Sequence, residues 1–115
     1  MTIVSIIMAV GFVAVLAAMS VWSAKGLARD QRLPMQWGFD GRATWRAPRD
    51  AALAFTPVLA ALTLIPTALA SLLGPLEGAG ARLYLGVLTG MGLAWVGAHA
   101  LHLWLMARWR RAEGV

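Results

Sequence analysis

Residues 2–24 read TIVSIIMAVGFVAVLAAMSVWSA, and no side chain in this stretch is charged. As an α-helix, at about 1.5 Å per residue, the stretch would be roughly 34 Å long, enough to cross a hydrocarbon core of about 30 Å. A cleaved signal peptide carries basic residues before its apolar part, whereas here Lys25, Arg29 and Arg32 follow it. We therefore expect an uncleaved membrane anchor with its N-terminus outside the cell.

Two further stretches, residues 51–73 and 83–107, contain no Lys, Arg, Asp or Glu. Asp50 precedes the first of them, where a negative charge suits the N-terminus of a helix. Gly and Pro residues between the two stretches predict a turn. The sequence therefore predicts an all-α membrane protein of one domain, residues 1–115, with three transmembrane helices at about residues 2–24, 51–73 and 83–107.

The overall composition agrees with this class. Apolar residues make up 60% of the 115 residues and charged residues 13%, whereas soluble domains carry about 25% charged residues. The absence of cysteine excludes disulfides, thiolate metal sites and cysteine nucleophiles. The net charge is +5. Because the basic residues flank the apolar stretches, we attribute this charge to membrane anchoring and expect no nucleic-acid partner.

The basic residues are divided unequally between the two sides that three crossings would define. The 25–50 loop and the C-terminus share one side, with Lys25, Arg29, Arg32, Arg42, Arg46, Arg49, Arg108, Arg110 and Arg111. Arg82 is the basic residue of the other side. The positive-inside rule places the loop and the C-terminus in the cytoplasm, in a bacterial inner membrane. The expected interfacial anchors are Arg108, Trp109, Arg110 and Arg111.

Small residues indicate how the helices pack. Lipid tails are as apolar as leucine, so helices in a membrane associate through close contact of small residues. On the third stretch they recur every fourth position and form what we call the small-residue stripe: Gly86, Gly90, Ala94 and Ala98. Thr63 and Thr67 lie on one side of the second stretch. We expect these two faces to meet inside the molecule; the alternative is that the stripe binds another molecule.

The loop between the first two helices contains the segment LPMQWGFDGRATWRAP, residues 33–48. Asp40-Gly41 suits the tight turn of a β-hairpin, and Met35, Trp37 and Phe39 alternate before it. Two arrangements are equally compatible with this pattern. One is a short β-hairpin on the cytoplasmic membrane surface, and the other is an irregular loop anchored by tryptophans such as Trp45.

This segment resembles the loop of the DUF1648 family, the small domain also found in SdpI-type immunity proteins. That loop reads roughly Pro-x-His-Trp-Asn-x-x-Gly-x-x-Asp between two membrane helices. Pro34, Trp37 and Gly41 match it, while Gln36, Gly38 and Thr44 stand at its His, Asn and Asp positions. Over about residues 3–75 the resemblance implies a helix–loop–helix arrangement and an immunity or regulatory role.

His99 and His102 are the histidines of the chain, three residues apart on the third stretch. That spacing can turn two imidazoles towards one metal ion or haem edge, and ionisable groups inside membrane spans are candidates for function. No Asp or Glu lies inside the three stretches to orient an imidazole. We interpret the pair as structural or interfacial, with haem or metal ligation and quinone or proton handling as alternatives.

No catalytic set is apparent. Asp30, Asp40 and Asp50 are spread evenly through a basic loop, where capping, turn formation and pairing with arginine explain them. We therefore expect a non-enzymatic membrane protein without a cofactor. It would act through helix packing and its basic cytoplasmic loop, in contact with anionic lipids and with other membrane proteins or copies of itself. The competing hypothesis is an accessory subunit of a larger respiratory or photosynthetic complex.

Overall fold

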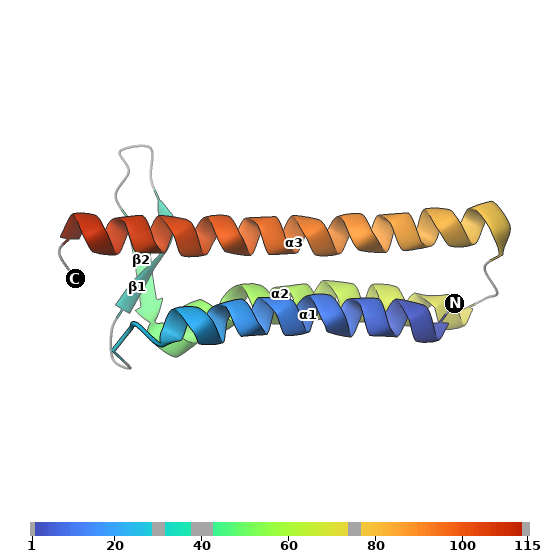
Figure 1. The fold of residues 1–115 in the computed structure, drawn as a ribbon, viewed down its shortest axis with the longest axis horizontal. Helices are drawn as coiled ribbons and strands as arrows, with labels where there is room; N and C mark the ends of the chain where they lie inside the picture. Colours follow the sequence, from blue (N-terminus) through green and yellow to red (C-terminus); the bar gives the residue numbers. More distant parts are fainter. Residues whose placement is uncertain (1, 29–31, 38–42, 74–76, 114–115) are drawn as a thin grey trace.

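The computed structural model describes residues 2–28, 32–37, 43–73 and 77–113. The elements within them are α1 (Thr2–Ala24), β1 (Arg32–Trp37), β2 (Ala43–Pro48), α2 (Arg49–Leu69), a 3-10 turn η1 (Ala70–Leu73) and α3 (Gly78–Glu113). The helices alternate in direction; α1 and α2 lie side by side, and α3 runs along both (Figure 1). Each of the three helices is long and apolar enough to cross a membrane.

α3 sets the length of the molecule. Its 36 residues, at about 1.5 Å each, extend roughly 54 Å, and the molecule measures 54 × 28 × 17 Å. The helix extends beyond the apolar stretch 83–107 at both ends. It begins at Gly78, whose φ of 57° suits a residue without a Cβ. Arg110 and Arg111 continue the helix in its last turn, where positive charge is favoured.

α2 contains two prolines and still continues for 21 residues before it tightens into η1. It begins at Arg49, with Asp50 in its first turn. Pro57 and Pro66 have no N–H to donate, so in each case the carbonyl four residues earlier loses its helical partner. For Pro57 that carbonyl belongs to Leu53, and a side chain of α1 replaces the missing donor.

β1 and β2 pair antiparallel, so the loop forms a hairpin and not an irregular segment. Leu33 pairs with Ala47, and the register shifts once before and once after the pair of Gln36 and Trp45. The expected Asp40-Gly41 turn lies outside the described residues. One side of the hairpin closes the end of the helix bundle through a buried cluster of Leu33, Met35, Ala47, Ala52, Leu53 and Met106.

A second buried cluster lies between the helices: Ala9, Leu16, Ala60, Leu64, Ala68 and Leu88. Its alanines belong to α1 and α2. Small side chains let two helices approach closely, which is the main source of helix association in lipid. α1 and α2 therefore pack against each other through small residues.

The small-residue stripe of α3 does not pack internally, which corrects our expectation. Its four residues are exposed, and a Cβ added at Gly86 or Gly90 would meet no atom within 4 Å. The inner face of α3, the side turned to α1 and α2, carries Leu88, Gly92, Trp95, His99 and Met106. The larger side chains of α3 face inward because they fill the space beside α1 and α2, which already pack against each other through alanines.

The α2 half of the expected contact is nevertheless present. Trp95 donates its indole N–H to the hydroxyl of Thr63 at 2.9 Å. The Tyr84 hydroxyl donates to the carbonyl of Thr67. Thr63 and Thr67 therefore meet α3 through aromatic hydrogen-bond donors and not through glycine or alanine.

Candidate functional site

A polar cluster, which we call the Ser20 cluster, links the three helices within their apolar part. The Ser20 hydroxyl of α1 donates to the carbonyl of Leu53 on α2 at 2.6 Å. Its oxygen also lies 2.8 Å from Nε2 of His99 on α3. Because Pro57 leaves the Leu53 carbonyl without a helical donor, Ser20 supplies the hydrogen bond that the proline removes.

The direction of the second bond follows from the number of protons. A serine hydroxyl has one proton, and here it points to Leu53, so His99 donates from Nε2 to Ser20. His99 is fully buried, and among the described residues its Nδ1 has no hydrogen-bond partner. The arrangement holds three helices in register at one depth.

His102 is half-buried and is not without an interaction partner. Within the described residues, no group of three or more His, Asp or Glu side chains converges to hold a metal ion. Ligation of haem or a metal through Nε2 of His99 would break its bond to Ser20. The hydrogen bonds give His99 a structural role between the helices, while ligation and proton handling by the two histidines stay predictions.

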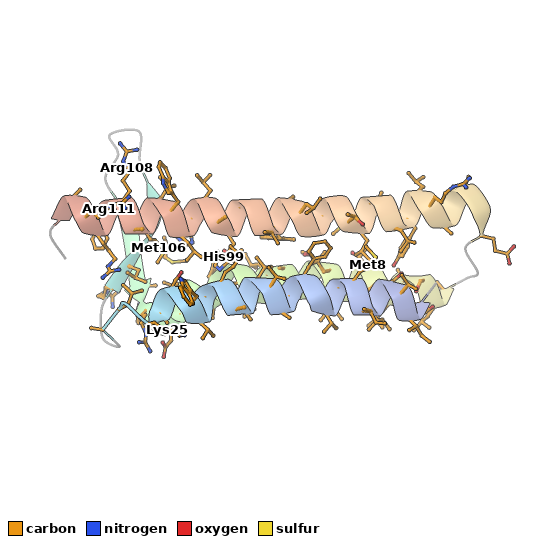
Figure 2. The ribbon with its side chains drawn as sticks, in the orientation of Figure 1. Met8, Lys25, His99, Met106, Arg108 and Arg111 are labelled. Carbon is orange, nitrogen blue, oxygen red and sulfur yellow. The ribbon has the colours of Figure 1, made fainter. Side chains whose placement is uncertain are left out.

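Except for Arg82 near the start of α3, the described basic side chains lie at the hairpin end of the bundle, where Figure 2 shows Lys25, Arg108 and Arg111. Two arginines fasten the chain just beyond α1. Arg49 donates from Nη1 to the carbonyl of Leu27 at 3.1 Å, and Arg110 from Nη2 to that of Gly26 at 2.9 Å. Carbonyls at a helix C-terminus lack helical donors and favour positive charge, so both contacts stabilise this end.

The four expected anchors lie at this same end. Arg108 and Arg111 are exposed, whereas Trp109 and Arg110 are half-buried. The Arg108 guanidinium lies 5.6 Å from the centroid of the Trp104 ring. On α1, Nζ of Lys25 lies 5.0 Å from the ring centroid of Trp22. Such pairs of a cation and an aromatic face are typical of a membrane–water interface.

Two adjoining cavities lie between α1 and α3 near the basic end. One, of about 530 Å³, is lined by residues that include Lys25, Gly26, Met106 and Arg110. The other, of about 460 Å³, is lined by residues that include Val15, Ala18 and Met19. Trp22, Ser23 and Leu103 line both, so the two cavities lie next to each other, and together we call them the α1–α3 groove. The groove is basic at one end and apolar at the other.

A separate cavity of about 400 Å³ lies between α1 and α2. Its lining is also largely apolar, with Val21, Ala54 and Val58. The charged residue that lines it is Asp50, which pairs with Arg49 at 2.9 Å. The charged lining of the two spaces beside α1 therefore differs: one has Lys25 and Arg110, and the other has an aspartate paired with an arginine.

The residues of the loop motif lie in the hairpin. Pro34, Gln36 and Trp37 are in β1, and Trp45 is in β2, where its backbone pairs with Gln36. Gly41 lies outside the described residues. The hairpin thus brings Gln36 and Trp45, which are distant in the motif, to neighbouring positions.

Comparison of the chain with protein-family models, with curated proteins and with solved structures returned no match. The resemblance of the loop to the DUF1648 family stays a prediction from the quoted residues.

The sequence analysis did not identify Ser20, and it did not predict that Lys25 and Arg110 line the same groove. A signal for Ser20 was present. Ser20 and Leu53 each lie four residues from the hairpin end of their helices, which end at Ala24 and begin at Arg49. In antiparallel neighbours this equal distance predicts equal depth, so Ser20 was a candidate donor for the carbonyl that Pro57 frees.

Proposed function

We propose that the chain is a non-enzymatic protein of the bacterial inner membrane that crosses the bilayer three times and self-associates through the small-residue stripe of α3. The exposure of that stripe carries the proposal, because α3 uses its other face to contact α1 and α2. In lipid, an exposed row of small residues lets a second helix approach closely, and Gly86 and Gly90 have GxxxG spacing. Two equal stripes can also form a symmetric interface.

The distribution of basic residues supports an orientation with the hairpin and the C-terminus in the cytoplasm. Each basic residue near an anionic membrane surface contributes about 1 kcal/mol of attraction. The hairpin end would therefore lie against the cytoplasmic leaflet. The resemblance to the DUF1648 family supports an immunity or regulatory role for this end of the protein.

The orientation predicts the behaviour of reporter fusions. A phosphatase that is active only in the periplasm is expected to be inactive when fused after Val115, because the basic end stays in the cytoplasm. The same reporter, fused before Thr2 and exported to the periplasm, is expected to be active. An active C-terminal fusion would reverse the proposed orientation.

Self-association can be tested by cysteine crosslinking, since the natural chain has no cysteine. We expect Ala94→Cys, in the stripe, to form a disulfide-linked dimer in native membranes under mild oxidation. The matched control is Leu62→Cys on α2, which is 65% exposed but lies outside the stripe. Gly90→Leu in the Ala94→Cys background should reduce the dimer several-fold, because the bulky side chain holds the second helix away.

Equal crosslinking at both positions would contradict the proposal, since it would report random collisions. A crosslink from Ala94→Cys to a larger, different membrane protein would instead favour the accessory-subunit hypothesis. Migration of the native protein in mild detergent with a large pigmented assembly would point the same way.

A further inference from the structure

We infer that the α1–α3 groove binds an anionic phospholipid, with its phosphate at Lys25 and Arg110 and one acyl chain running between α1 and α3 towards Val15. The inference rests on the proposed membrane insertion but not on self-association through the stripe. It concerns a different side of α3 from the one that carries Gly86 and Gly90.

The basic end of the groove offers two cations to an anion. Arg110 uses Nη2 to reach the carbonyl of Gly26, while its Nε is buried without a hydrogen-bond partner among the described residues. Lys25 is held at the same cavity against the face of Trp22. A guanidinium presents several N–H donors in a fixed plane, which suits phosphate oxygens.

The described acidic side chains do not neutralise these two cations. Asp50 pairs with Arg49, and Glu77 lies at the opposite end of the bundle, before α3 begins. Within the described part of the chain, neither Lys25 nor Arg110 forms an ion pair. An anion in the groove would therefore meet positive charge that the described acidic side chains leave uncompensated.

The whole groove, including its basic end, is about as deep as one leaflet. From Lys25 to Val15 the groove follows α1 for roughly 15 Å, about half of a hydrocarbon core of about 30 Å. Ala18 and Ser23 keep it open on the α1 side, and Ala107 does so on the α3 side. Trp22 is 73% exposed and lies where the two cavities join, at the level where a glycerol backbone would lie.

The cavity between α1 and α2 is the internal contrast. It is similar in size and also apolar, but its charged lining residue is the acidic Asp50. Because Asp50 is paired with Arg49, an anionic headgroup meets no free positive charge there, whereas Lys25 and Arg110 attract it. Charge complementarity therefore selects the α1–α3 groove, and it selects a lipid because the apolar part continues from the basic part.

The test uses the full chain in phosphatidylcholine vesicles with a trace of spin-labelled phosphatidylglycerol or spin-labelled phosphatidylcholine. The fraction of immobilised label gives the relative association of each lipid. We expect phosphatidylglycerol to be preferred, and Lys25→Gln with Arg110→Gln to lower that preference about thirtyfold, since each basic residue contributes about 1 kcal/mol near an anion. The matched control, Arg108→Gln with Arg111→Gln, removes equal charge from outside the groove and should change the preference less than twofold.

Two further variants separate the headgroup from the acyl chain and from misfolding. Lys25→Gln alone alters an exposed side chain and should lower the preference about threefold to fivefold. Ala18→Phe fills the apolar part and should reduce the immobilised phosphatidylglycerol by at least half. Excess inorganic phosphate should not displace the lipid, because free phosphate lacks the apolar contacts.

Three results would overturn the inference: equal association of both lipids with the natural chain, equal losses in the two double variants, or displacement of the label by inorganic phosphate. The first two would leave general surface charge as the cause. Resistance of the chain to alkaline extraction from the vesicles distinguishes these failures from a failure of membrane insertion, which would overturn the proposed function as well.

Discussion

The two faces of α3 use glycine in opposite ways. On the inner face, Gly92 lies so close to Phe12 of α1 that an added Cβ would overlap the aromatic ring. On the outer face, Gly86 and Gly90 have nothing within 4 Å of an added Cβ. The same residue type on one helix thus marks a close internal contact in one case and a free surface in the other.

The difference shows that the structural role of a glycine on α3 depends on whether another helix lies next to it. α3 is held to α1 and α2 mainly by large and polar side chains, of which Leu88, His99 and Met106 are buried. Gly92 is an exception among them that accommodates one ring. The regular stripe is then left available for another helix, while the single glycine is part of the fold.

Substitution of these two glycines should give the largest contrast. Gly92→Ala forces the Phe12 ring to move, and overpacking of this kind usually lowers the free energy of unfolding by about 1–3 kcal/mol. Gly90→Ala meets open space and removes a flexible residue from a helix, so it should leave stability unchanged or raise it by up to about 1 kcal/mol. Unfolding in mixed micelles with a rising fraction of dodecyl sulfate, at dilution that keeps the protein monomeric, measures both.

A second substitution checks the cause of the Gly92 effect. Phe12→Leu shortens the opposing side chain, so Gly92→Ala in that background should lose most of its effect. Equal destabilisation by Gly90→Ala and Gly92→Ala would remove the distinction between the two faces.

The three long apolar helices were predictable from the sequence because each depends on a sum over many residues. Some twenty uncharged residues together favour hydrocarbon strongly, whatever their neighbours. The alternation of Met35, Trp37 and Phe39 before Asp40-Gly41 suited a hairpin but left an irregular loop equally open, and the strand pairing decides between them. The ends of α3 were not predictable from hydropathy, because the helix continues from Gly78 to Glu113 through residues that are not apolar.

The inward face of α3 could not be predicted for a different reason. The small-residue stripe and the inner face both repeat with helical spacing, and in lipid no polar surface separates inside from outside. The groove was equally hidden, since Lys25 and Arg110 are far apart in the sequence and meet through the docking of α3 on α1. His99 was recognised as a candidate residue, but its partner Ser20 on α1 was not. The position of Ser20 is explained only by Pro57 of α2, which frees the Leu53 carbonyl.

Loss of the Ser20 hydroxyl should have a smaller effect on stability than the Gly92 substitution. Ser20→Ala leaves the Leu53 carbonyl and Nε2 of His99 without partners. Hydrogen bonds between membrane helices contribute about 0.6 kcal/mol on average and up to about 1.7 kcal/mol. Because two groups are affected, we expect a loss of about 1 kcal/mol in the same unfolding measurement. Ser23→Ala, on the same helix and outside the cluster, should change stability by less than about 0.3 kcal/mol.

The same substitution in a Pro57→Ala background tests the mechanism. Alanine at this position restores an N–H that can reach the Leu53 carbonyl through the helix, so Ser20 is then required for His99 alone. Ser20→Ala should therefore lower the free energy of unfolding by about half as much as it does with the proline present. An equal loss in both backgrounds would mean that Ser20 does not replace the donor missing at Pro57. In that case His99 and the surrounding packing would stabilise the contact of α3 with α1 and α2 at this depth.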